Sequence, residues 1–220
     1  MERQLDQQLD ELKSEFLRMG AEVEESIVIA LRALVERSDE HAAAVIASNK
    51  RIDAWEVEIE GKILTLMATQ QPVATDLRLL ATMMKINYDL ERINDEAVNI
   101  AQRAIELNKA PQLKPFIDLP RMANIAQEMV KAALDAFVRR DPEAARDVCR
   151  RDEELDLLRD QIFRELLSYM RDGNDTVERA IQLILVSRHL ERMGDHSSNI
   201  SENVVFLAEG HIIRHRKDEL

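Results

Sequence analysis

Residues 90–100 read LERINDEAVNI, and residues 190–200 repeat this stretch as LERMGDHSSNI. Six of the eleven aligned positions are identical, and the identical set includes charged and amide residues as well as apolar ones. An internal repeat of this kind indicates that the chain contains two copies of one structural unit. Because the polar residues are kept, we expect the two units to share chemistry as well as fold.

The composition is typical of a helical protein. Charged residues make up 33% of the chain and hydrophobic residues 45%, with only 5 Gly and 5 Pro among 220 residues. Apolar residues recur at helical spacing along nearly the whole sequence, and no stretch shows the two-residue period of a strand. We therefore predict an all-α fold of two tandem antiparallel three-helix bundles, with six long helices.

The few helix breakers divide the chain into its expected elements. Pro72 is expected in the first turn of the third helix, where its missing N–H would be unpaired anyway. Prolines 111, 115 and 120 interrupt the middle of the chain. The expected helices cover residues 2–37, 40–70, 72–109, 120–140, 142–171 and 175–209. The predicted domains are a first repeat at 1–110, a linker at 111–119, a second repeat at 120–210 and a tail at 211–220.

The repeat extends into the helix that precedes each motif. Aligning Met67 with Met170 also aligns Asp53 with Asp156. The offset between these helices is 103 residues, whereas the two motifs are 100 residues apart. We infer that the turn between the second and third helix is three residues shorter in the second repeat.

Each motif carries two acids at helical spacing. Glu91 and Asp95 form one pair, and Glu191 and Asp195 form the other. Residues four apart lie on the same helix face, with Cβ atoms about 6 Å apart. Counting back from hairpin turns near residues 72 and 174 places further residues opposite these pairs. The first expected cluster is Asn49, Asp53, Glu91 and Asp95, and the second is Asp152, Asp156, Glu191 and Asp195.

Carboxylates gathered in this way must take up protons or share a cation. Oxygen ligands favour hard cations such as magnesium, manganese, calcium or iron over structural zinc. His196 is a further candidate ligand at the second cluster, and Asn99 and Asn199 are candidates one turn on. The first cluster is expected to be the weaker site, because Asn49 stands where an acid would help. The alternative is a solvated surface, since 42 acids give about eight such pairs by chance.

Several classes of protein are disfavoured. The net charge of −12 argues against a nucleic-acid-binding protein, which needs a basic face. No apolar run is long enough to cross a membrane, and no signal peptide is visible, so we expect a cytoplasmic protein. The sequence contains no glycine-rich phosphate loop, nucleophile elbow or HExxH motif, and catalysis therefore has no visible site.

Two motifs together give the chain a family resemblance. The Leu-Glu-Arg-x-x-Asp motif occurs in both halves, and residues 71–78, QPVATDLR, open the third helix. With these motifs and its two three-helix repeats, nearly the whole chain resembles the PhoU family of bacterial phosphate-uptake regulators. The resemblance implies multinuclear metal clusters on the bundle surface, holding iron, manganese, magnesium or zinc. The implied ligands are Asp53, Glu91 and Asp95 at one cluster, and Asp152, Asp156, Glu191 and Asp195 at the other.

The resemblance also implies a function without catalysis. A protein of this family would be a negative regulator of phosphate uptake and of the phosphate-starvation response. It would act as an adaptor between the ATPase subunit of a phosphate ABC transporter and a phosphate-sensing histidine kinase. We expect a homodimer that is cytoplasmic and reaches the inner membrane only peripherally, through its partners. The alternatives are a metal-dependent helical enzyme and a structural or chaperone-like helical protein.

Overall fold

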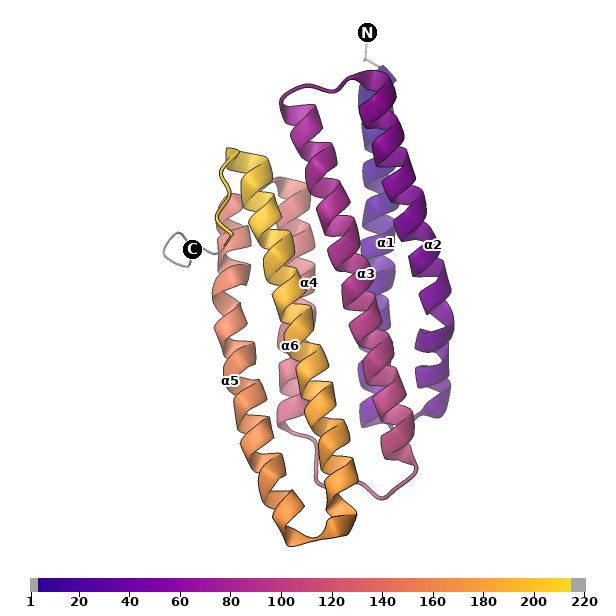
Figure 1. Cartoon of the computed structure of the whole chain (residues 1–220), viewed down its shortest axis with the longest axis vertical. Coiled ribbons are helices and arrows are strands. Elements are labelled where there is room, and N and C mark those ends of the chain that lie inside the picture. Colours follow the sequence, from indigo (N-terminus) through magenta and orange to yellow (C-terminus); the bar gives the residue numbers. More distant parts are fainter. Residues whose placement is uncertain (1–3, 215–220) are drawn as a thin grey trace.

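The computed structural model describes residues 4–214 and shows six long helices in that range (Figure 1). No strand occurs among these residues, so the predicted all-α fold is confirmed. Of the expected tail at 211–220, residues 215–220 lie outside the described part. The helices are α1 (Gln4–Val35), α2 (Asp39–Gln70), α3 (Thr75–Asn108), α4 (Asp118–Arg139), α5 (Pro142–Asp172) and α6 (Asn174–Glu209).

Capping residues explain several of the helix ends. The Ser38 hydroxyl accepts a hydrogen bond from the backbone N–H of His41 and so caps the start of α2. Asp141 caps α5 in the same way, and Pro142 follows it in the first turn. Gly210 ends α6 with a φ of 74°, a left-handed conformation that glycine adopts without strain.

The start of α3 differs from the prediction. The helix begins at Thr75, so Pro72 lies in the connection between α2 and α3 and not in a helical turn. Gln71 and Ala74, the residues that flank this connection, both have a φ of 48°. A positive φ at both positions interrupts the helical path on each side of Pro72. The connection between α3 and α4 covers residues 109–117, two residues earlier than the predicted linker at 111–119, because α3 ends at Asn108 and α4 begins at Asp118.

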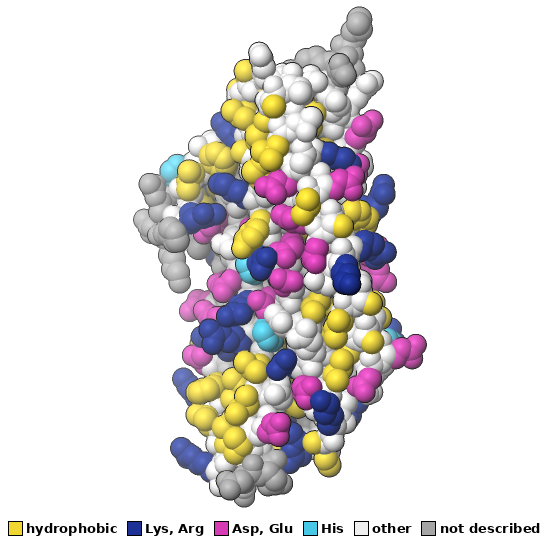
Figure 2. Space-filling view, turned by 45° about the vertical axis from the view of Figure 1, so that its right-hand side comes forward, with side chains coloured by type: hydrophobic (Ala, Val, Ile, Leu, Met, Phe, Trp, Pro, Cys, Tyr) yellow, Lys and Arg dark blue, Asp and Glu magenta, His cyan; other side chains and the backbone are white. Residues whose placement is uncertain are grey.

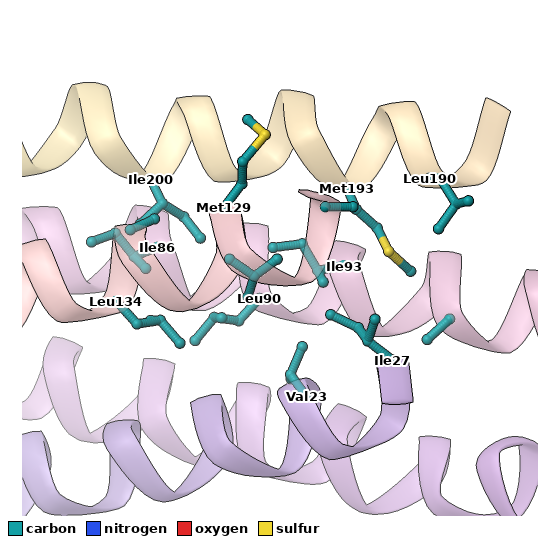
Figure 3. Close-up of a cluster of buried hydrophobic side chains, with 14 of the residues drawn as sticks. Val23, Ile27, Ile86, Leu90, Ile93, Met129, Leu134, Leu190, Met193 and Ile200 are labelled. Atoms are coloured by element: carbon teal, nitrogen blue, oxygen red, sulfur yellow. The ribbon is translucent and has the colours of Figure 1, made fainter. Parts of the chain in front are cut away.

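The helices form two three-helix units that meet along α3 and α6, which run antiparallel (Figure 1). One continuous apolar core, with contributions from all six helices, joins the two units. Figure 3 shows part of this core, where Leu90 of α3 and Met193 of α6 are fully buried together with residues of α1 and α4. Each such buried side chain stabilises the fold by about 1.5–3 kcal/mol. The two bundles are thus one packed body. None of the helices in residues 4–214 combines the length and apolar character of a membrane span.

Polar pairs also cross the α3–α6 contact. Nδ1 of His189 lies 2.5 Å from a carboxylate oxygen of Glu96, and Nδ1 of His196 lies 2.9 Å from one of Asp89. Positions 89 and 96 are equivalent to 189 and 196 in the repeat. The two pairs are therefore equivalent when the halves are exchanged, with the acids on α3 and the histidines on α6. This arrangement favours the pairing of unlike halves, because two copies of α3 would place acid against acid.

Candidate metal centre

Three acids of the first half converge on one point. Asp53 of α2 and Glu91 and Asp95 of α3 each offer an oxygen, and these three oxygens lie within 4.8 Å of one another. Figure 2 shows acidic side chains gathered at mid-height on the face formed by these helices. Among the side chains that the structure describes, no second group of three acid, histidine or cysteine ligands is as close. Counting residues back from the predicted turn near residue 72 therefore placed Asp53 correctly opposite the acid pair of α3.

Asn49, the fourth expected member of this cluster, holds Asp53 in place. Its amide nitrogen donates to Oδ2 of Asp53 at 3.2 Å, and its amide oxygen accepts from Nδ2 of Asn94 at 2.7 Å. The other oxygen of Asp53, Oδ1, is buried and has no hydrogen-bond partner. The amide that was expected to weaken the site thus orients one ligand and leaves its second oxygen available to a cation.

The centre carries excess negative charge. Burial, together with the neighbouring charge of Asp95, raises the pKa of Glu91 from 4.5 to about 7, although Arg92 opposes this shift. Burial also raises the pKa of Asp95, again against the effect of Arg92 and with a further increase from Asp53. A bound cation would remove this electrostatic penalty, because it favours the ionised form of all three acids.

Among the described residues, Arg92 is the one cation that contacts the centre, and it lies at the edge. Its Nε is 2.6 Å from Oε2 of Glu91, and its Nη1 is 3.2 Å from Oδ2 of Asp95. Its Nη2 also donates a hydrogen bond to Oε1 of Glu91 at 3.0 Å. The guanidinium also lies over the ring of Tyr88, 5.1 Å from its centroid. One guanidinium therefore offsets only part of the charge of three carboxylates. The donor set consists only of oxygens, and Oδ1 of Asp53 is buried without a hydrogen-bond partner, so the set fits a hard cation.

The second cluster is arranged differently, because Arg159 lies among its acids. Nη1 of Arg159 is 2.8 Å from Oδ1 of Asp156 and 2.5 Å from Oε1 of Glu191. Its other terminal nitrogen is 3.0 Å from Asp160. A guanidinium thus occupies the place where the sequence pattern suggested a metal ion. In the aligned repeat, position 159 corresponds to Glu56, so this difference between the halves was visible in the sequence.

The remaining predicted residues of the second cluster lie beside this pair. Burial raises the pKa of Asp195, and Glu191 and Asp156 add to the effect. Asp152 lies against Gly194, where a Cβ atom would stand 3.2 Å from its Oδ1. The sequence pattern ranked the second cluster above the first, whereas the structure places the tighter group of acids in the first half.

The predicted auxiliary ligands have other partners. His196 contacts Asp89, and Nδ2 of Asn199 donates to the same carboxylate at 3.4 Å. Nδ2 of Asn99 donates to Glu96 at 3.4 Å. His196 and Asn199 thus join α6 to α3, and Asn99 contacts an acid of its own helix, so none of the three extends a metal site. The matched positions of the acids and histidines in the repeat were the signal that could have revealed this role.

Comparison with known proteins places this geometry in a family. The PhoU domain model matches the chain twice, at residues 16–104 and 119–204. A phosphate-specific transport system accessory protein PhoU homolog of Clostridium acetobutylicum is 39% identical over 92% of this chain and 93% of its own length. A homolog of the same name from Aquifex aeolicus is 38% identical over 95% of each chain.

Solved structures show the same likeness. The crystal structure of PhoU from Pseudomonas aeruginosa superposes with a TM-score of 0.92 at 34% identity, covering 94% of this chain and all of the other. The phosphate transport system regulatory protein PhoU from Streptococcus pneumoniae gives a TM-score of 0.87 at 28% identity, covering 95% of this chain and 99% of the other. These names describe accessory and regulatory proteins, not enzymes.

Proposed function

The chain belongs to the PhoU family, and on this premise we propose that it is a negative regulator of phosphate uptake and of the phosphate-starvation response. The observation that supports this most strongly is the match over nearly the full length to accessory proteins of phosphate transport systems. The role is that of a regulator and not of an enzyme.

The proposed mode of action is that of an adaptor. The chain would bind the ATPase subunit of a phosphate ABC transporter and a phosphate-sensing histidine kinase, and so report transport to the kinase. The two repeats, 1–110 and 120–210 with the linker 111–119, carry different side chains on their outer faces and can offer a different surface to each partner. The protein would be cytoplasmic, form a homodimer and meet the inner membrane only through its partners.

We further propose that the first acid cluster binds a metal ion. Asp53, Glu91 and Asp95 would hold it, and Asn49 would keep Asp53 oriented. The buried Oδ1 of Asp53, which has no hydrogen-bond partner, and the raised pKa values of Glu91 and Asp95 support this assignment. When bound, the ion would neutralise the three acids and link α2 to α3. Magnesium, manganese and iron are the cations that oxygen ligands suit best, and zinc is the least favoured of the four candidates.

The function is tested by alkaline phosphatase activity in phosphate-replete cells of the source organism. Deleting the gene should raise this activity, because the phosphate-starvation response would lose its repressor. Restoring the wild-type gene should lower it again. Low activity in the deletion strain would contradict the proposed role. Restoration with Asp95→Asn, compared with Asp156→Asn as control, then asks whether regulation depends on the metal centre.

A further inference from the structure

Arg92 is the counter-ion of two of the three acids in the first cluster. Its Nε is 2.6 Å from Oε2 of Glu91, and its Nη2 donates to Oε1 of Glu91 at 3.0 Å. Its Nη1 is 3.2 Å from Oδ2 of Asp95. The guanidinium therefore engages both oxygens of Glu91 and one oxygen of Asp95. It neutralises part of their charge without a metal ion.

The same contacts place Arg92 in competition with a metal ion. Glu91 and Asp95 are two of the three residues whose oxygens converge within 4.8 Å. A divalent ion held by these oxygens would share the two carboxylates with the guanidinium, and like charges at such short range repel each other. The guanidinium also uses carboxylate lone pairs that a cation coordinated by oxygen would take. Arg92 and a metal ion therefore oppose each other's binding to this cluster.

The third acid, Asp53, is not served by Arg92. Among the described residues no lysine or arginine pairs with Asp53, and its Oδ2 instead accepts a hydrogen bond from Asn49 at 3.2 Å. Arg92 lies on α3 together with Glu91 and Asp95, whereas Asp53 lies on α2. Arg92 thus neutralises acids of its own helix only. A cation held by all three acids would serve both helices, which gives it an advantage over the guanidinium.

The surroundings of Arg92 allow its guanidinium to move. The side chain is 41% exposed, and its ion pairs in the described part of the chain are with Glu91 and Asp95 of the same helix. Its other contact is with the ring of Tyr88, which is 54% exposed. A cation over an exposed ring is held only weakly. Moving the guanidinium into solvent therefore leaves the core side chains in place.

The second half contains a fixed counter-ion for comparison. Arg159 lies on α5 and pairs with Glu191 of α6 as well as with two acids of its own helix. It therefore connects two helices, as a shared metal ion would. Arg192, the residue equivalent to Arg92 in the repeat, lies 3.5 Å from Glu96 of α3. The second half thus has a built-in cation between its helices, whereas Arg92 serves one helix.

We infer that Arg92 is a displaceable counter-ion of the first acid cluster. It pairs with Glu91 and Asp95 in the metal-free protein, and it leaves both acids and the ring of Tyr88 when a divalent ion binds there. The exchange places a free guanidinium and an uncovered tyrosine ring on the surface of α3, where a partner protein can distinguish the two forms. The inference rests on the proposed metal centre and adds the way in which its occupancy changes the surface.

The first test compares the Mn²⁺ affinities of full-length variants by calorimetry. Arg92→Gln removes the competing charge, and Arg92→Lys retains a positive charge at the same position. Arg103→Gln is the control, because Arg103 lies about 12 Å along α3 from Asp95, where salt screens its charge. The side chain of Arg103 donates to Gln182. Circular dichroism and thermal melting establish that each variant is folded.

We expect Arg92→Gln to bind Mn²⁺ about tenfold more tightly than wild type, because the repulsion is removed. The affinity of Arg92→Lys should lie between these two, and Arg103→Gln should bind like wild type. Equal or weaker binding by Arg92→Gln refutes the competition. An equal gain in Arg103→Gln shows an effect of net charge alone, which also refutes it. If wild type binds no Mn²⁺, the proposed metal centre fails, and this inference fails with it.

The second test follows the guanidinium by nuclear magnetic resonance of isotope-labelled arginine side chains. Mg²⁺ at a concentration that fills the first cluster should shift the Nε–Hε signal of Arg92 and speed its exchange with water, because the ion pair with Glu91 is lost. The signal of Arg159 should not change, and the variants Arg92→Gln and Arg159→Gln identify the two signals. If the Arg92 signal keeps its position and its slow exchange in the Mg²⁺-bound protein, the displacement is refuted. A change of equal size at Arg159 refutes it too, since the effect would not be local.

Discussion

Replacing Glu91 with glutamine should stabilise the metal-free protein at alkaline pH. The pKa of Glu91 is raised from 4.5 to about 7 by burial and by Asp95. At about 1.36 kcal/mol per pH unit, this difference corresponds to ~3.4 kcal/mol at most. Only 13% of the side chain is exposed, but the centre is open to solvent on one side and Arg92 offsets part of the charge. We therefore expect a gain of about 1–2 kcal/mol in the free energy of unfolding.

The sign of the pH dependence follows from the raised pKa. At pH values below 4.5 the carboxyl group is protonated in both the folded and the unfolded state, and glutamine brings no gain. As the pH rises from 4.5 to about 7, the unfolded chain releases its proton more readily than the folded chain, which destabilises the fold. The penalty is complete above about pH 7, and Glu91→Gln removes it there.

Urea denaturation in the presence of a chelator measures this effect. The free energies of unfolding of wild type and Glu91→Gln should differ by about 1–2 kcal/mol at about pH 8 and by much less at about pH 4. Glu191→Gln is the control, because Arg159 pairs with Glu191 and its loss should bring no gain at alkaline pH. An equal effect of Glu91→Gln at both pH values would refute the reasoning, and so would destabilisation at about pH 8.

Four further variants have predicted effects. Arg159→Met removes the guanidinium from the second cluster, so this variant should bind more Mn²⁺ per chain than wild type in equilibrium dialysis. Asn49→Ala removes the hydrogen bond that orients Asp53, and calorimetry should show an affinity for Mn²⁺ about tenfold lower than that of wild type. Gly194→Ala places a Cβ in collision with Leu155 and should cost about 1–3 kcal/mol in thermal melts. Gly61→Ala meets no atom within 4 Å and should instead stabilise α2 by about 0.8–1.0 kcal/mol.

Much of the fold could be predicted from the sequence, because the helical period indicates helices and the repeat indicates two like units. The repeated motif at residues 90 and 190 predicted two like units, and the few breakers set most helix ends to within two residues. The start of α3 did not follow, because Gln71 and Ala74 have a positive φ that their residue types do not favour. The shared core of the two units also depends on tertiary packing, which the helical period alone does not specify.

The candidate site was predictable in part. The spacing of four residues predicted that Glu91 and Asp95 share a helix face. Counting residues back from the predicted turn placed Asp53 opposite them. Counting residues from the turn shows only which positions lie opposite one another. It did not show that the side chain of Arg159 would reach the acids of the second cluster. This count also could not predict contacts between the halves, because those contacts depend on how α3 packs against α6. His196 was therefore grouped with the nearby acids, although it contacts Asp89.

The most direct test of the metal centre is the Mn²⁺ content of the purified protein after dialysis against the ion and removal of the excess. We predict that wild type and Asp156→Asn retain Mn²⁺, because the first cluster is intact in both. Asp95→Asn should lose it, because one of the three converging oxygens becomes part of an uncharged amide. Retention of the ion by Asp95→Asn, or its absence from wild type, would contradict the account.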